Sequence, residues 1–107
     1  MIQFQDLTKV DQVLYKKILE TINANQKIAF ADELMCSLTA PGKLKAIKQK
    51  SHHALGQLSV EELKQYEVLM EMLCGSENLI IFDQQMSNLT PKAKLQAIQS
   101  FSIEGDC

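Results

Sequence analysis

The sequence contains few of the residues that mark specialised classes of protein. Its 107 residues include four Gly, two Pro, three Cys and no Trp, and aromatic side chains make up 6% of the chain. So little Gly and Pro excludes collagen-like and low-complexity chains, and an odd number of widely spaced cysteines argues against a disulfide framework. Hydrophobic residues amount to 46% and charged residues to 22%, as in ordinary globular proteins. We therefore expect one folded domain, residues 1–107, with its own hydrophobic core.

Long apolar runs are lacking as well. No segment approaches the roughly 18 apolar residues of a membrane-spanning helix, and the opening residues MIQFQD show no basic stretch ahead of an apolar one. We expect reduced thiols at Cys36, Cys74 and Cys107, as in a reducing compartment. The sequence therefore predicts a soluble cytoplasmic protein without membrane association.

The most informative feature is an internal repeat. Residues 7–51 align without a gap with residues 58–102, and 12 of these 45 positions are identical, where chance would give about three. The identical pairs are Leu7/Leu58, Tyr15/Tyr66, Glu20/Glu71, Asp32/Asp83, Met35/Met86, Leu38/Leu89, Thr39/Thr90, Lys43/Lys94, Leu44/Leu95, Ala46/Ala97, Ile47/Ile98 and Ser51/Ser102. What the copies share is mostly helix caps and apolar positions, which indicates a duplicated fold.

Each copy reads as three helices. The first begins after a cap at Thr8 or Ser59, and its apolar residues follow the i, i+3, i+4, i+7 spacing of a helix. Turn-forming residues at 23–27 and 74–78 separate it from a second helix at about 28–38 and 79–89. A third helix follows Thr39 or Thr90 and in the first copy is expected to run to Leu55. The prediction is an all-α, single compact domain of about six helices from two tandem, pseudo-twofold-related three-helix repeats, with a flexible tail at 103–107.

Few residues suggest chemistry. His52 and His53 are adjacent and point about 100° apart on a helix, so they cannot share one metal ion from one face. A twofold axis could bring Asp32 and Asp83 together as a carboxylate pair, although an acid early in a helix also offsets the helix dipole. Tyrosines at 15 and 66 fall in apolar stripes, with their hydroxyls expected at the surface. The sequence predicts no cofactor and no metal, and it identifies no small-molecule substrate.

A basic segment breaks the repeat. The chain carries a net charge of −2, but lysines at 43, 45, 48 and 50 run into two histidines, whereas the second copy keeps only Lys94 of these lysines. Such a segment is either a solvated face or a surface that binds a partner or an anion, and with the preceding helix it is similar in layout to helix-turn-helix DNA-binding proteins. The candidate partner-binding or anion-binding residues are Lys43, Lys45, Lys48, Lys50, His52 and His53.

These observations leave three functional hypotheses. The favoured one is a non-enzymatic protein–protein interaction module, a small regulator, adaptor or inhibitor that binds a protein partner or forms a homodimer through its helical surface. The alternatives are a nucleic-acid-binding regulator that uses the basic helix 43–53, and a small enzyme with an unrecognised site. Five Met and several apolar residues outside the shared core positions favour the first hypothesis. The apolar residues are Phe4, Val60, Val68, Ile80 and Phe101.

Overall fold

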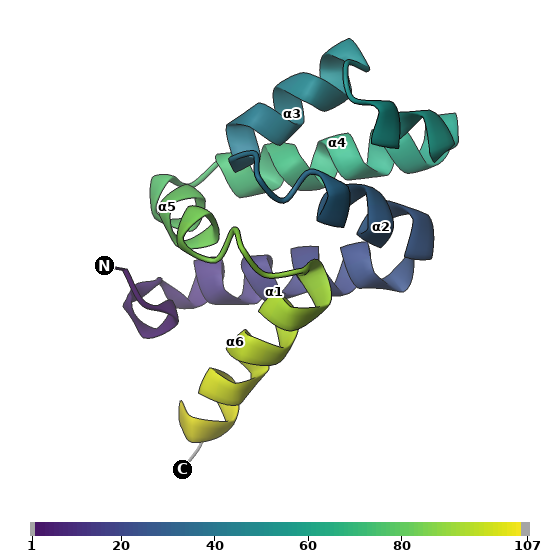
Figure 1. Ribbon diagram of the computed structural model, residues 1–107. Helices are drawn as coiled ribbons and strands as arrows, with labels where there is room; N and C mark the ends of the chain where they lie inside the picture. Colours follow the sequence, from purple (N-terminus) through teal and green to yellow (C-terminus); the bar gives the residue numbers. More distant parts are fainter. Residues whose placement is uncertain (1, 106–107) are drawn as a thin grey trace.

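The computed structural model describes residues 2–105, with side chains for residues 2–100, and within this part it contains helices and no strand (Figure 1). The expected flexible tail, residues 103–107, lies outside the described side chains. Two short 3₁₀ helices, η1 and η2, accompany six α-helices. In chain order the elements are η1 (Phe4–Asp6), α1 (Lys9–Ala24), α2 (Gln26–Leu34), α3 (Ala40–Gln49), η2 (His53–Gln57), α4 (Val60–Cys74), α5 (Glu77–Gln85) and α6 (Pro91–Gly105).

The helices form one compact domain. Its Cα radius of gyration is 13.3 Å, close to the roughly 13 Å of a globular domain of about 100 residues. In Figure 1, the long helix α4 lies above the long helix α1, and α2 lies between them. Helix α6 crosses α1. Helix α3 packs chiefly against α4, and α6 packs chiefly against α1. The third helix of each sequence repeat therefore packs mainly on the first helix of the other.

The helix starts follow the predicted caps. The side chains of Thr8, Ser59 and Thr39 accept hydrogen bonds from backbone N–H groups in the first turns of α1, α4 and α3, and Thr90 does the same for α6 through Ala93 at 3.2 Å. Such bonds pair amides that have no partner within the helix. These four predicted starts are confirmed.

The second and third helices differ from expectation at their ends. Asn25 caps α2 through the amides of Lys27 and Ile28, so this helix begins inside the predicted turn. It also ends earlier, at Leu34, and α5 ends correspondingly at Gln85. Helix α3 does not reach Leu55, because the backbone leaves the helical region directly after Gln49.

The core lies where the helical stripes meet. Both predicted stripes of the first helices are buried, and α2, α3, α5 and α6 add further aliphatic residues. Burial of this apolar surface is the main force that holds the six helices together. The most completely buried large side chains are Tyr15, Tyr66, Ile18, Ile22, Ile28, Met35, Met70, Leu79 and Ile98.

Helix α3 ends at a strained residue. Lys50 adopts φ 50° and ψ 40°, the left-handed region that glycine occupies at little cost. Its amide donates to Ile47 at 3.2 Å, and the Ser51 amide donates to Ala46 at 3.0 Å, so the turn satisfies two carbonyls at the helix end. The hydrogen bonds hold Lys50 in a conformation that its side chain disfavours.

Replacing Lys50 should therefore stabilise the protein. We expect Lys50→Gly to raise the free energy of unfolding by about 0.5–1 kcal/mol, since glycine relieves the left-handed strain. Lys48→Gly is the matched control, because it places glycine inside the same helix and should lower that free energy by about 1 kcal/mol. Urea denaturation followed by circular dichroism measures both. A Lys50→Gly variant as unstable as Lys48→Gly would contradict the assignment.

Candidate functional site

A buried acid, Asp32, lies at the contact between α2, α3 and α4. It is 3% exposed, and its Oδ1 accepts hydrogen bonds from Lys43 Nζ at 2.9 Å and from the Tyr66 hydroxyl. Lys43 belongs to the same sequence repeat as Asp32, whereas Tyr66 belongs to the other. A buried carboxylate needs such charged and polar partners, because its desolvation is otherwise costly. The cluster thus joins the two halves of the chain.

A second cluster has the same composition. Asp83 is 4% exposed, and its Oδ1 accepts from Lys94 Nζ at 2.9 Å and from the Tyr15 hydroxyl at 2.7 Å. Here the acid and the lysine come from the second repeat and the tyrosine from the first. Within the described side chains, every buried nitrogen and oxygen atom has a hydrogen-bond partner. Both clusters are therefore fully satisfied polar networks in an apolar interior.

These contacts correct two expectations. The sequence placed Asp32 and Asp83 early in their helices, but they lie in the last turns of α2 and α5, where a negative charge is unfavourable to the helix dipole. Their ion pairs with Lys43 and Lys94 offset this unfavourable position. The hydroxyls of Tyr15 and Tyr66 do not reach the surface, since both residues are 0% exposed. Burial first, then the charge of the bound aspartate, raises the pKa of each tyrosine well above its ordinary value of 10.0.

The two acids lie near each other around one small cavity. Asp32 and Asp83 line the same internal cavity, whose volume is about 10 Å³. A space of this size holds about one water molecule and no substrate. Each carboxylate is also engaged by a lysine and a tyrosine. The clusters therefore join the two halves through hydrogen bonds, and the shared identities of Tyr, Asp and Lys in both repeats were the sequence signal for these contacts.

The tyrosines should make stability fall in alkali. Below pH 10 they keep their protons in both folded and unfolded chains, whereas above pH 10 only the unfolded chain releases them readily. The free energy of unfolding should therefore fall as the pH rises above about 10, by at most roughly 1.4 kcal/mol per pH unit for each tyrosine.

Denaturation at a series of pH values tests this dependence. The double variant Tyr15→Phe/Tyr66→Phe should be less stable at neutral pH by about 1–3 kcal/mol per hydroxyl removed. It should also lose less stability between pH 9 and pH 11 than the parent protein. Because the variant keeps every lysine, the difference isolates the tyrosines. Parallel curves for the two proteins would refute the assignment.

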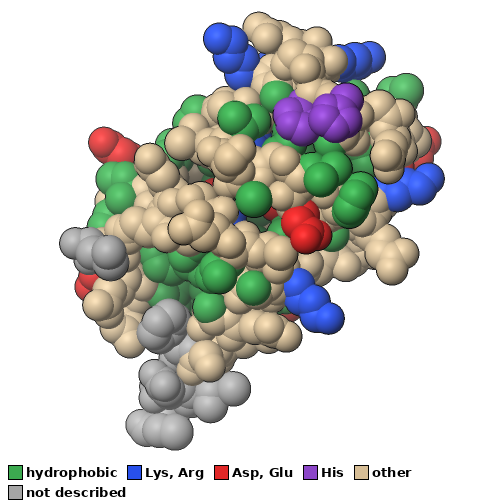
Figure 2. Space-filling view, viewed as in Figure 1, with side chains coloured by type: hydrophobic (Ala, Val, Ile, Leu, Met, Phe, Trp, Pro, Cys, Tyr) green, Lys and Arg blue, Asp and Glu red, His purple; other side chains and the backbone are tan. Residues whose placement is uncertain are grey.

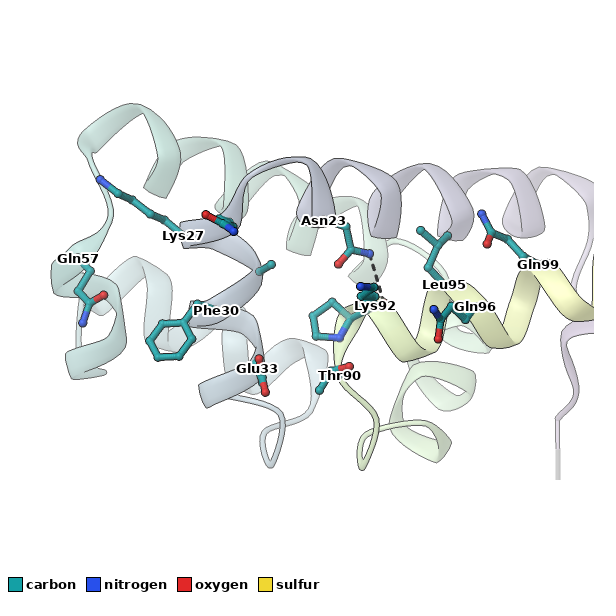
Figure 3. Close-up of a pocket in the computed structure, with 13 residues that line it drawn as sticks. Asn23, Lys27, Phe30, Glu33, Gln57, Thr90, Lys92, Leu95, Gln96 and Gln99 are labelled. Atoms are coloured by element: carbon teal, nitrogen blue, oxygen red, sulfur yellow. Dashed lines mark hydrogen bonds between the residues drawn. The ribbon is translucent and has the colours of Figure 1, made fainter.

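A groove of about 1000 Å³ lies between α2 and α6 (Figure 3). The end of α1 and the 3₁₀ helix η2 complete its walls. Asn23 in its floor donates from Nδ2 to the carbonyl of Pro91 at 3.3 Å, which ties α1 to the start of α6. The lining residues are Asn23, Gln26, Lys27, Ala29, Phe30, Glu33, Gln57, Thr90, Pro91, Lys92, Leu95, Gln96 and Gln99.

The groove combines amide side chains with an exposed aromatic ring. Phe30 is 49% exposed and lies at one end of the groove in Figure 3, while Leu95, Gln96 and Gln99 follow along α6 towards the other. A side-chain amide can both donate and accept a hydrogen bond, as peptide backbone requires. No histidine, cysteine or serine is among the residues that line it.

The predicted basic surface is divided by the structure. Lys43 is 2% exposed and faces Asp32, so it is not available to a partner, which corrects its inclusion among the binding residues. Lys45, Lys48, Lys50 and His53 are exposed and His52 is half-buried. These five side chains line two separate hollows. Lys45 and Lys48 line one of them, and Lys50, His52 and His53 line the other.

The two histidines lie side by side. Their rings stack with centroids 5.0 Å apart, and His52 Nδ1 accepts a hydrogen bond from the Ala54 amide at 3.3 Å. Figure 2 shows the pair in purple above a central area in which hydrophobic side chains reach the surface. Among the described residues, no group of three or more His, Cys, Asp or Glu side chains is placed to hold a metal ion.

The apolar residues that the sequence placed outside the shared core positions also differ in their exposure. Phe4 is buried and its ring centroid lies 5.9 Å from that of Phe82, so it belongs to the core rather than to a binding patch. Val60 is 81% and Val68 is 47% exposed, and Ile80 is half-buried. The side chain of Phe101 lies outside the described residues. Sequence reasoning missed Phe30, although its counterpart Ile81 is also apolar and exposed.

Comparisons with protein-family models, with curated protein sequences and with solved structures gave no significant match for the chain. Within the described residues, no helix is both long enough and apolar enough to cross a membrane.

Proposed function

We propose that the two sequence repeats form two three-helix units related by a pseudo-twofold axis. Three reciprocal features support this arrangement. The third helix of each unit packs mainly on the first helix of the other, and Tyr66 and Tyr15 each donate to the aspartate of the opposite unit. The two ion pairs join residues 11 positions apart in both units. Exchanging the units would preserve all of these contacts.

We propose further that the protein is a non-enzymatic interaction module that binds a segment of a protein partner in the groove between α2 and α6. The groove itself, about 1000 Å³ with Phe30 and Leu95 among amide side chains, is the observation that carries this proposal. Apolar anchors surrounded by hydrogen-bonding groups are characteristic of protein-binding surfaces. The module therefore acts as a regulator, adaptor or inhibitor of its partner.

An enzymatic function has less support. The two buried acids are engaged by lysine and tyrosine, and no histidine, cysteine or serine is among the residues that line the groove. Binding rather than catalysis accounts for its lining. A cytoplasmic location belongs to the same proposal, since the described cysteines, Cys36 and Cys74, are free thiols.

Site-specific photo-crosslinking in living cells tests the groove. A photoreactive amino acid in place of Phe30 should capture one protein in a stoichiometric complex, whereas the same amino acid in place of Val13 should not. Val13 is the matched control because it is 68% exposed and does not line the groove.

Substitution provides the complementary measurement. Phe30→Ser should weaken binding of the captured protein by roughly tenfold or more, as expected for loss of an aromatic anchor, and Val13→Ser should leave it unchanged. Titration of the purified partner by calorimetry gives both affinities. A partner that binds the two variants equally, or a protein that stays monomeric and captures nothing at either position, would refute the proposal.

Nucleic-acid binding is the second candidate, because Lys45, Lys48 and Lys50 remain exposed. Its support is reduced by the burial of Lys43 and by the net charge of −2. We expect no binding of duplex DNA or RNA at low salt in a mobility-shift assay. Binding that weakens steeply with salt and disappears in Lys45→Gln/Lys48→Gln/Lys50→Gln would instead establish the nucleic-acid function.

A further inference from the structure

A second hollow, which we term the lysine cleft, lies where α3 meets the end of α4. Its volume is about 320 Å³. Apolar atoms of Pro41, Leu44 and Cys74 contribute to its lining, and Lys45 and Lys48 supply two exposed positive charges. Gln49 completes the set of lining residues. No acidic side chain is among them.

The lysine cleft corresponds to the groove in the other half of the chain. Each residue of the cleft has a counterpart 51 positions away in the other sequence repeat. For five of the six lining residues, this counterpart lines the groove. The correspondence is Pro41 with Lys92, Leu44 with Leu95, Lys45 with Gln96, Lys48 with Gln99, and Cys74 with Asn23. The duplicated fold therefore carries two hollows built from matching positions.

The two hollows differ in charge. Leu44 and Leu95 keep an apolar contact in both, but the amides Gln96 and Gln99 of the groove are replaced by lysines in the cleft. Burial raises the pKa of the Cys74 thiol, so this residue adds no negative charge at neutral pH. The lining of the groove, in contrast, includes the acid Glu33 as well as Lys27 and Lys92. The lysine cleft is thus the more strongly cationic of the two matched positions.

We propose that the lysine cleft is a second binding site, which takes an acidic segment of a protein partner with an apolar side chain. The carboxylates pair with Lys45 and Lys48, and the apolar side chain packs on Pro41 and Leu44. A protein segment fits better than a nucleic acid, because duplex binding relies on many phosphate contacts along a basic stripe. Here the lining combines two lysines with apolar atoms, in a molecule of net charge −2.

This inference rests on the proposed function only in taking a protein as the partner, since the cleft and the groove share no lining residue. The probe is a fluorescein-labelled synthetic peptide in which glutamates flank a central leucine. Fluorescence anisotropy measures its affinity, and the amide signals of α3 in NMR spectra locate its binding. We expect binding that weakens with salt, with shifts at Leu44, Lys45 and Lys48.

Substitutions that copy one hollow into the other provide the decisive test. Lys45→Gln/Lys48→Gln gives the cleft the amides of the groove and should weaken peptide binding by about tenfold, as expected for the loss of two surface charge pairs. Lys9→Gln/Lys17→Gln is the matched control, since it removes the same charge from exposed positions on α1 that line neither hollow. Gln96→Lys/Gln99→Lys should create a second peptide site on α6.

Peptide controls separate the possible outcomes. Replacing leucine by serine should weaken binding, and replacing the glutamates by lysines should abolish it. Equal affinities for the cleft variant and its α1 control, or NMR shifts away from α3, would overturn the proposal. Tighter binding of a duplex oligonucleotide than of the peptide would overturn it in favour of nucleic acid. Phe30 does not line the cleft, so Phe30→Ser should leave peptide binding unchanged. The cleft can therefore bind the peptide even if the groove proposal fails.

Discussion

The charges of Asp32 and Asp83 can remain inside this protein only because each carboxylate receives a lysine ammonium and a tyrosine hydroxyl. The lysine comes from the same half of the chain as the acid, and the tyrosine comes from the other half. An acid deprived of either donor would be a buried charge with incomplete pairing, which is among the most destabilising defects in a protein core. The relative position of the two halves is therefore specified by directional hydrogen bonds as well as by apolar packing.

This constraint shapes the surface as well as the core. Successive residues of a helix point about 100° apart, so Lys45 faces nearly opposite to Lys43. Lys43 points inward to Asp32, whereas Lys45 and Lys48 line a hollow on the outer side of the same helix. The matching helix α6 also turns Lys94 inward, and it presents Gln96 and Gln99 to the groove. The inward lysine is thus alike in the two helices, whereas the side chains on their outer faces differ in charge.

Much of the fold was predictable because its signals are local. Caps at Thr8, Ser59, Thr39 and Thr90 and the spacing of apolar residues depend on neighbours within a few positions, and they placed the helix starts correctly. The ends of α2 and α3 depend on tertiary packing and on the left-handed turn at Lys50, which propensity alone does not reveal.

The candidate site was less predictable because its partners are distant in the chain. Lys43 was predicted to belong to a basic surface because it stands close to other lysines in the sequence. This spacing does not show which side of the helix is buried. The tyrosine hydroxyls were expected in solvent since their acceptors lie in the opposite half of the sequence. The groove assembles residues from four elements, so no single stretch of sequence carries its pattern.

The crossed packing of α3 on α4 and of α6 on α1 makes the two halves of the chain depend on each other. Under the proposed pseudo-twofold arrangement, a solitary three-helix unit lacks the tyrosine that its aspartate binds, and its third helix lacks the helix on which it mainly packs. Two identical units would supply each other with both. Such a dimer loses its partner on dilution, whereas a fused chain does not. Joining the two proposed units in one chain therefore makes the same contacts independent of protein concentration, and it allows each unit a surface of its own.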